Sequence, residues 1–133
     1  MTFQPLVSTD DLSLTVPLKI NANFKAARYV NTSAMSASFT VWADDASGDG
    51  KDVYLVTTAA SAVTATMPSA VSTMALEGRP VTVLKVDGGA GAVTVDGESA
   101  QTVNGAATVS LASQYKYVTM ISDGANWVII GSN

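Results

Sequence analysis

The sequence predicts an all-β fold: an antiparallel β-sandwich or barrel of jelly-roll type, preceded by a less regular N-terminal segment. Three observations support this prediction: short runs rich in valine and threonine recur along the chain, turn sequences separate them, and apolar and polar residues alternate within them. β-Branched side chains favour strands because they pack well on a pleated, half-buried surface. Several short strands at spacings of about 8–15 residues, joined by turns, are typical of sandwiches and barrels.

Seven strands are expected after residue 51. They are DVYLVTT (52–58), AVTATMP (62–68), PVTVLKV (80–86), AVTVDG (92–97), AATVSLA (106–112), YKYVTMI (115–121) and NWVIIG (126–131). The run at 106–112 alternates most regularly, with Ala107, Val109 and Leu111 on one face. An earlier strand is expected at 36–44, with Phe39 and Val41 opposite Thr40 and Trp42.

The connections carry turn residues. Asp87-Gly88-Gly89, Asp96-Gly97 and the segment SDGAN (122–126) are expected to form tight hairpin turns, because Asp-Gly pairs supply positive φ angles at little steric cost. The segment 69–79 lies between Pro68 and Pro80, so we expect a crossing loop with one helical turn ended by Gly78.

The acidic stretch DDASGDGKD (44–52) is the sharpest break in the chain. It divides the sequence into an N-terminal arm at 1–50 and a β-sandwich domain at 51–133. Within the arm, 12–20 is strand-like, but Pro17 confines it to a sheet edge or an extended arm. Residues 21–30 are compatible with a helix or a strand.

Composition excludes several classes of function. The chain has 133 residues, the size of one domain, and no cysteine or histidine, which removes disulfides, thiolate metal sites and the commonest general base. Its net charge of −4 does not suit a nucleic-acid surface. No signal peptide and no apolar run of the ~18 residues needed to span a membrane is found. We therefore expect a soluble protein made in a cytoplasm, with no nucleic-acid or membrane partner.

The acidic stretch resembles the start of a calcium-binding loop, because Asp45, Ser47, Asp49 and Gly50 supply oxygens and a glycine at suitable spacing. However, the position that requires a bidentate glutamate is Val56, and the flanking segments are strands. A solvated acidic hairpin loop is therefore expected, with no metal.

No enzyme and no cofactor is predicted. The other candidate carboxylates fall in expected turns, where acidic residues are common for local hydrogen bonding: Glu77, Asp96, Glu98 and Asp123. A serine triad needs a histidine, and DGGAGAV lacks the lysine and the helix of a phosphate-binding loop.

The last strand is unusual because Trp127, Val128, Ile129 and Ile130 are consecutive apolar residues. Such a run is typical of a strand covered on both faces, whereas one face of a monomeric sandwich strand is solvated. A second subunit is the simplest cover, so these four residues are candidates for self-association. A different hypothesis is an aromatic platform for sugars, formed from Trp42, Trp127, Tyr29, Tyr54, Tyr115 and Tyr117.

Residues 52–130 also carry several short motifs in a fixed order. These are Gly78-Arg79, Lys85-Val86-Asp87, Val93-Thr94-Val95-Asp96-Gly97, Gln101-Thr102-Val103-Asn104-Gly105, Gln114-Tyr115 and Asp123-Gly124-Ala125-Asn126-Trp127. In this order and spacing the chain resembles a β domain that recurs in virion proteins of tailed phages. It departs from the family pattern at Lys116, where an acidic or small residue is usual, and at Met67, where leucine is usual.

The resemblance implies a homotrimeric structural protein of the virion. With only about 50 residues before the domain, the chain is most similar to a capsid decoration (cement) protein, which would bind the major capsid protein on the exterior of the phage head after assembly in the host cytoplasm. The alternatives are a short head or tail fibre, or adhesin, that binds host glycans, and a non-viral carbohydrate-binding module. Apolar residues of the arm are the candidates for capsid attachment: Phe3, Leu6, Val7, Leu12 and Leu14.

Overall fold

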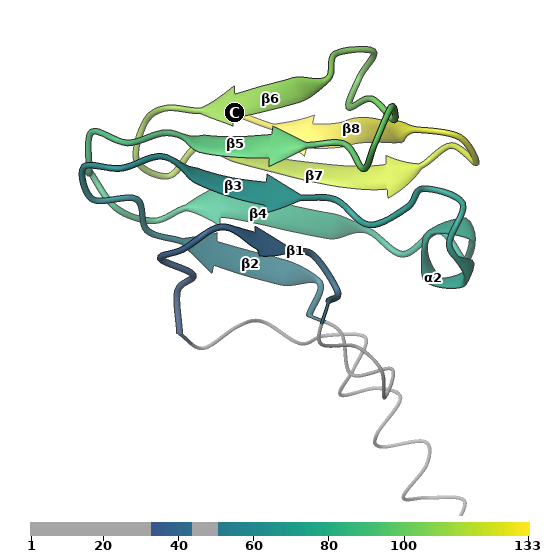
Figure 1. Cartoon of the computed structure of the whole chain (residues 1–133), viewed down its shortest axis with the longest axis horizontal. Helices are drawn as coiled ribbons and strands as arrows, with labels where there is room; N and C mark the ends of the chain where they lie inside the picture. Colours follow the sequence, from purple (N-terminus) through teal and green to yellow (C-terminus); the bar gives the residue numbers. More distant parts are fainter. Residues whose placement is uncertain (1–32, 44–50) are drawn as a thin grey trace, which may run out of the picture.

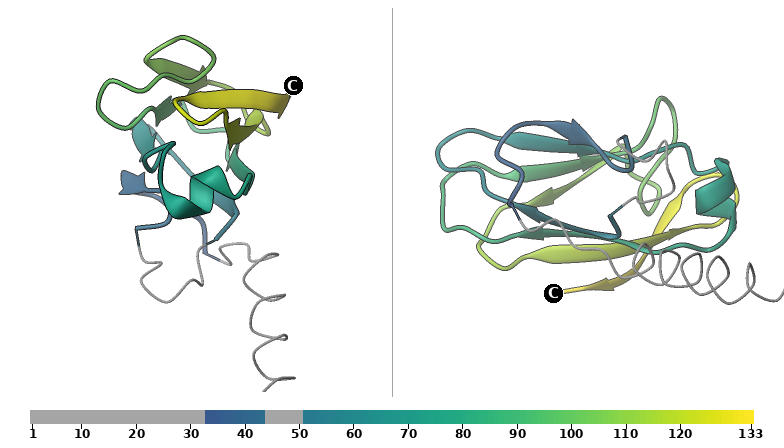
Figure 2. Two further views of the ribbon diagram at one scale, coloured as in Figure 1. Left: turned by 90° about the vertical axis from the view of Figure 1, so that its right-hand side faces the viewer. Right: turned by 90° about the horizontal axis from the view of Figure 1, so that it is seen from below.

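The computed structural model describes residues 33–43 and 51–133, which form two four-stranded sheets and one helical turn (Figure 1). The front sheet of Figure 1 contains, in spatial order, β1 (Phe39–Thr40), β3 (Val63–Thr66), β5 (Val93–Asp96) and β6 (Thr108–Leu111). The back sheet contains β2 (Val53–Val56), β4 (Val81–Lys85), β7 (Tyr117–Ser122) and β8 (Trp127–Ser132). The predicted all-β class is confirmed, and Figure 2 shows the two sheets as stacked layers.

The expectation of a wholly antiparallel structure is wrong. The pairs β1–β3, β2–β4 and β3–β5 are parallel, whereas β4–β7, β5–β6 and β7–β8 are antiparallel. From β1 to β5 each successive strand lies in the opposite sheet, so strands two apart in the sequence become neighbours with the same direction. The two mixed sheets are not closed into a barrel, and the jelly-roll topology is not confirmed.

The glycines after β4 therefore lie in a connection that crosses from the back sheet to the front sheet. The hairpin turn expected at Asp87-Gly88-Gly89 does not form. A Cβ on Gly89 would collide with the carbonyl oxygen of Ala59, and one on Gly91 would collide with that of Ser61. Glycine is needed here because two crossing loops approach each other closely. The expected turn at 122–126 does join the antiparallel neighbours β7 and β8. β5 and β6 are also antiparallel neighbours, but a long loop from Gly97 to Ala107 connects them, so the tight turn expected at Asp96-Gly97 does not form.

The core lies between the sheets. Alternate residues of each strand point inward, and those of the central strands are almost completely buried. The fully buried members include Val56, Val81, Val83, Ala65, Val93, Val95, Met120 and Trp127.

Residues 33–43, which precede the expected domain boundary, are part of this fold. Met35 pairs with the edge strand β2, and β1 then extends the front sheet, so this segment passes from one sheet edge to the other. The strand ends early because Trp42 has a positive φ of 62°. That turn buries the Trp42 side chain, so the prediction that Trp42 lies on the outer face with Thr40 is wrong.

The crossing between β3 and β4 contains the single helical turn expected there, α2 (Thr73–Leu76). Ser72 caps its N-terminus, where the side-chain oxygen accepts a hydrogen bond from the Ala75 backbone N–H at 3.4 Å. Gly78, with a φ of 77°, follows the turn and redirects the chain into β4.

Candidate functional site

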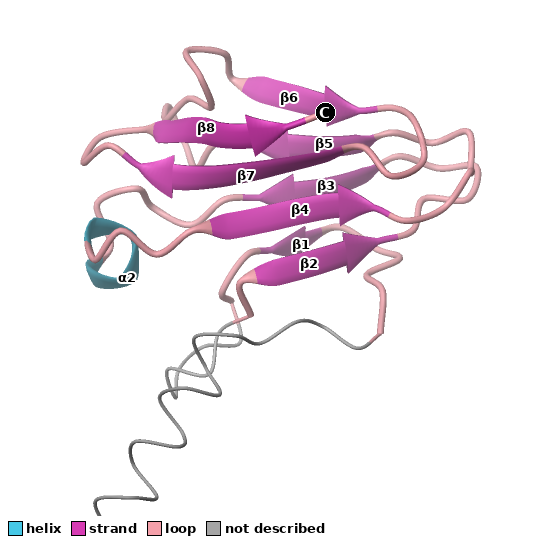
Figure 3. Ribbon diagram, turned by 180° about the vertical axis from the view of Figure 1, so that it is seen from behind, coloured by secondary structure: helices cyan, strands magenta, loops and turns pink. Residues whose placement is uncertain are grey.

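The outer face of the back sheet is apolar, and we call it the back face. Figure 3 looks onto it, and no described strand or helix lies across it. Its residues alternate with core residues along each strand and are all half-buried. They are Val53, Leu55, Thr82, Leu84, Tyr117, Thr119, Ile121 and Val128.

Strand register places these side chains in rows across the sheet. Leu84 lies between Leu55 on β2 and Tyr117 on β7. In the next row the hydroxyls of Thr82 and Thr119 are 2.8 Å apart and hydrogen-bond to each other. Gly131 pairs with Thr119 and adds no side chain, which leaves room beside Thr119 and Tyr117.

The outer face of the front sheet, which we call the front face, has the opposite character. Its strands present hydroxyl-bearing and acidic side chains, and the central residue Thr94 lies between Thr64 and Ser110. The outward residues are Thr40, Thr64, Thr66, Thr94, Asp96, Thr108 and Ser110. Thus only one of the two outer faces lacks the polar surface expected of a solvated sheet.

The four residues predicted for self-association are divided between the core and the surface. Trp127 is fully buried, and Ile129 packs against the core opposite Met120. Val128 belongs to the back face. Ile130 is a bulge residue, because Ile129 pairs with Met120 and Gly131 pairs with Thr119, and it is 57% exposed. The expected cover on both faces of this strand is therefore absent among the described residues of the single chain.

Trp127 joins the last strand to the rest of the core. Its indole N–H donates to the carbonyl of Pro68 at 2.9 Å, and its ring meets that of Trp42 edge to face, with centroids 6.0 Å apart. Trp127 therefore belongs to the core of the single chain, and an aromatic sugar platform that includes Trp42 and Trp127 is excluded because both rings are buried.

A buried ion pair closes one end of the two sheets. The Lys85 side chain is completely buried, and its ammonium donates to Asp87 Oδ1 at 2.8 Å, Thr58 Oγ1 at 2.7 Å and the Gly89 carbonyl at 3.0 Å. The Asp87 carboxylate also accepts the backbone N–H groups of Thr58 and Ala59. The hydrogen bond from Lys85, helped by that from Ala59, holds the pKa of Asp87 far below its usual range. With these partners, the pair holds the β2–β3 and β4–β5 connections together.

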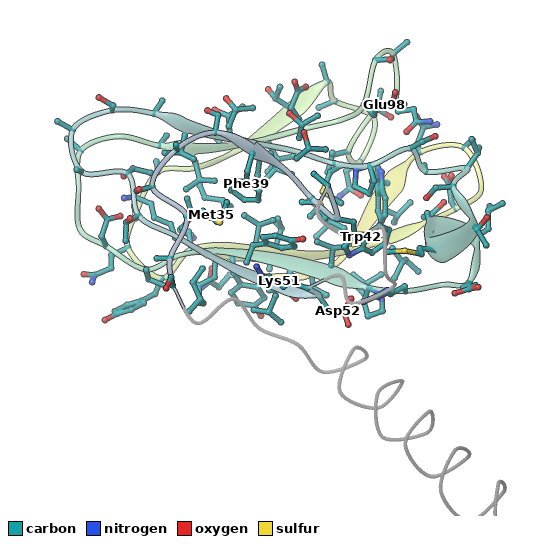
Figure 4. All side chains as sticks on the ribbon, turned by 60° about the horizontal axis from the view of Figure 1, so that its bottom comes forward. Met35, Phe39, Trp42, Lys51, Asp52 and Glu98 are labelled. Carbon is teal, nitrogen blue, oxygen red and sulfur yellow. The ribbon has the colours of Figure 1, made fainter. Side chains whose placement is uncertain are left out.

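A second cluster lies at the opposite end, near the exit of the acidic stretch (Figure 4). The Arg79 guanidinium lies 5.3 Å from the centre of the Trp42 ring and pairs with Asp52 at 2.5 Å. The Trp42 indole donates to the Lys51 carbonyl at 3.0 Å, and its backbone N–H donates to the Tyr54 hydroxyl at 2.8 Å. These contacts fix the end of β1 against β2 and β4.

Amide side chains of the remaining motifs also hold loops. Gln101 Oε1 accepts from the Ala70 backbone, Asn104 Oδ1 from that of Ile129, and Asn126 Oδ1 from that of Thr102, at 2.8–2.9 Å. Asp123 accepts the backbone N–H groups of Ala125 and Asn126 within its own turn, and these bonds lower its pKa. These motif residues are therefore engaged in the framework of the fold.

Several predicted sites lie outside the described residues. These are the attachment candidates Phe3, Leu6, Val7, Leu12 and Leu14, and the acidic residues Asp45 and Asp49. Within residues 33–43 and 51–133, no three His, Cys, Asp or Glu side chains are grouped to hold a metal ion. In the same ranges no helix has the length and apolar character needed to cross a membrane.

Of the back-face residues, the sequence analysis named only Val128, for self-association, and Tyr117, for a sugar platform. A signal for the rest is present: the runs that form the back sheet have apolar residues at both alternating positions, as in VYLV (53–56). The runs that form the front sheet pair apolar residues strictly with threonine, serine or aspartate, as in VTVD (93–96).

No protein-family model matches this sequence, and a search of curated proteins found no match.

Proposed function

We propose that this chain is a structural virion protein, a capsid decoration (cement) protein that binds the exterior of a tailed-phage head as a homotrimer and stabilises it. It would have a trimeric β-sandwich as its body, and the part of the N-terminal arm that precedes residue 33 would attach it to the major capsid protein. Nucleic acid and membranes are not partners in this proposal, and the protein is not an enzyme.

The observation that carries the proposal is the ordered set of motifs that resembles the phage domain. Several motifs have a structural task in this fold: Lys85 and Asp87 join two loops, Arg79 packs on Trp42, and Asn126 holds the loop beside β8. Motif residues that hold loops together indicate a shared scaffold, because their spacing in the sequence is set by the loops that they connect. The function itself then belongs to surfaces around that scaffold.

The apolar back face supports an assembled state, since a solvated sheet face is normally polar. An arm with apolar residues at alternating positions, from Leu12 to Leu18, suits strand addition to the edge of another sheet, in which backbone hydrogen bonds supply affinity. Three such arms on one trimer would strengthen a weak contact through effective concentration.

The test is reconstitution on phage heads that lack the protein. Purified protein should bind these heads at a saturable number of sites and raise the temperature at which they release DNA, as measured by dye access. Heads that already carry a full complement serve as the control and should bind no more. Failure to bind the deficient heads would refute the proposal.

Tyr115 favours one alternative, a short fibre or adhesin that binds host glycans. It is a loop residue with a φ of 64° and a side chain that is 61% exposed, and exposed aromatic rings can stack on sugars. Binding of the isolated protein to host-surface polysaccharide, lost on Tyr115→Ala, would favour this alternative over the cement protein.

A further inference from the structure

We propose that the back face is the surface by which three copies of the chain pack around a threefold axis, with their back sheets facing one another. This inference rests on the trimer in the proposed function, and it assigns the contact to particular residues. The occupant of the face is thus a second and a third copy of the same chain.

The chemistry of the face favours a like partner. None of its eight outward residues is charged, so it offers no complement to an acidic or basic partner. Contacts between copies of one chain have apolar centres depleted of charge and polar rims. Charged side chains lie at the ends of the back sheet: Arg79 pairs with Asp52 at one end, and the Lys116 ammonium donates to the Asn133 carbonyl at 2.6 Å at the other.

The two hydroxyls at the centre of the face are already suited to burial. Thr82 and Thr119 hydrogen-bond to each other across β4 and β7 at 2.8 Å. A polar group can be removed from water at low cost when its hydrogen bond is retained. The pair therefore needs no partner from another molecule, and an apolar surface can cover it.

The width of the sheet agrees with threefold symmetry. Four strands about 4.8 Å apart make a face roughly 19 Å wide. If three such faces form the sides of an equilateral triangle around the threefold axis, each back sheet lies about 5.5 Å from that axis. Facing sheets are normally about 10 Å apart, so each contributes a side-chain layer of about 5 Å. Three back sheets would fill the space around the axis with one layer of side chains each.

The first experiment measures the mass of the full-length protein and of two matched variants by sedimentation equilibrium. Leu84 and Thr94 are both half-buried, outward residues on inner strands, each with a paired neighbour on either side, but they lie on opposite faces. Leu84→Glu should give a folded monomer, or raise the concentration for half-assembly roughly 100-fold or more, because an unpaired charge would be buried. Thr94→Glu should remain a trimer.

The second experiment uses the absence of cysteine, which makes a single introduced thiol unique. Thr119→Cys should be linked between copies by a bismaleimide with a span of about 10 Å, in keeping with positions about 5 Å from the axis. Thr94→Cys should not be linked. This measurement stands even if Leu84→Glu fails to fold.

Four results would overturn the inference: a monomeric or dimeric wild type, a trimer that is unchanged by Leu84→Glu, equal disruption by Thr94→Glu, or equal linkage at both cysteines. A monomer that becomes an oligomer only when residues 1–32 are deleted would instead assign the face to the chain's own arm. A trimer with these properties that does not bind phage heads would leave the inference standing and refute the proposed function.

Discussion

Replacement of Lys85 with methionine tests whether the buried ion pair holds the loops together. Methionine keeps most of the apolar stem but removes the ammonium, which donates to Asp87, Thr58 and Gly89. The change leaves the Gly89 carbonyl without this donor in a part-buried position and removes the cation beside the Asp87 carboxylate.

The expected loss in the free energy of unfolding is about 3 kcal/mol. The completely buried Lys85 ammonium loses three hydrogen bonds, and a hydrogen bond to a charged group contributes about 1.5–3 kcal/mol. We expect a total near the upper value for one such bond, since the Asp87 side chain retains 24% exposure and the backbone N–H groups of Thr58 and Ala59.

Urea denaturation followed by tryptophan fluorescence measures this loss, with wild type and variant at the same protein concentration so that any assembly affects both. Lys116→Met is the matched control: Lys116 is exposed, and its substitution should change the free energy of unfolding by less than about 0.5 kcal/mol. A loss below about 1 kcal/mol for Lys85→Met would refute the assignment of Lys85 to loop fastening.

The same pair predicts a dependence on pH. Because the pKa of Asp87 is lowered in the folded state, its contribution to stability is complete above the ordinary value of 3.8 and is lost as the pH falls below it. Lys85→Met removes the largest cause of that lowering. The difference in stability between wild type and variant should therefore narrow as the pH falls below 3.8, and a difference that stays constant down to acid unfolding would contradict this reasoning.

The remaining predictions concern the core, a crossing and the two segments outside the described residues. Trp127→Ala should lower the free energy of unfolding by about 3–5 kcal/mol in chemical denaturation, because it empties a fully buried site; a stable, fully assembled variant would contradict this. Gly89→Ala should lower the melting temperature because its Cβ would collide with the backbone of Ala59. Gly105→Ala is the control for backbone strain alone, because Gly105 has a positive φ but a Cβ there meets no atom within 4 Å. Equal losses of melting temperature in the two variants would argue against close packing of the crossing loops. Asp45→Asn with Asp49→Asn should leave the melting temperature nearly unchanged with calcium or chelator; stabilisation of the wild type by many degrees on addition of calcium would show that the loop binds the ion. Deletion of residues 1–11 should abolish attachment to phage heads while the β domain still forms trimers, and attachment at full strength would move the contact to the loops of the domain.

The strands were predictable from the sequence because their signals are local. Each expected run between residues 52 and 131 overlaps one observed strand, and only β7 and β8 extend one residue past the expected end. The turn at 122–126 forms because Asp123 accepts backbone hydrogen bonds within it. The helical turn before Gly78 was also predictable, since a capping serine and a terminal glycine mark it.

The pairing of the strands was not predictable in the same way. Alternation shows which residues of a strand face the core, but it does not identify the neighbouring strand. The crossing at 87–92 looks like a hairpin turn in sequence. The need for glycine there becomes clear only when the neighbouring backbone of Ala59 and Ser61 is known, because a Cβ would collide with it. Likewise, the left-handed backbone of Trp42 depends on contacts with Tyr54 and Arg79 that are distant in sequence.

The candidate surface was only partly predictable. The run of four apolar residues at 127–130 drew attention to β8, but the bulge at Ile130 and the burial of Trp127 divide that run between two environments. The larger signal was distributed over four strands, and it becomes a surface only when their order in the back sheet is known.

The alternation of strands between the two layers has a consequence for biosynthesis. β7 and β8 follow all the other strands in the chain, yet they form half of the back sheet. A growing chain that has emerged from the ribosome only as far as β6 therefore contains every strand of the front sheet but only β2 and β4 of the back sheet. Only the part of the back face that lies on β2 and β4 exists on that intermediate. Its completion depends on pairing of β7 with β4, strands more than 30 residues apart, which is slower than closure of a local hairpin. In the proposed trimer, association between neighbouring nascent chains would therefore be postponed until each chain has completed its back sheet.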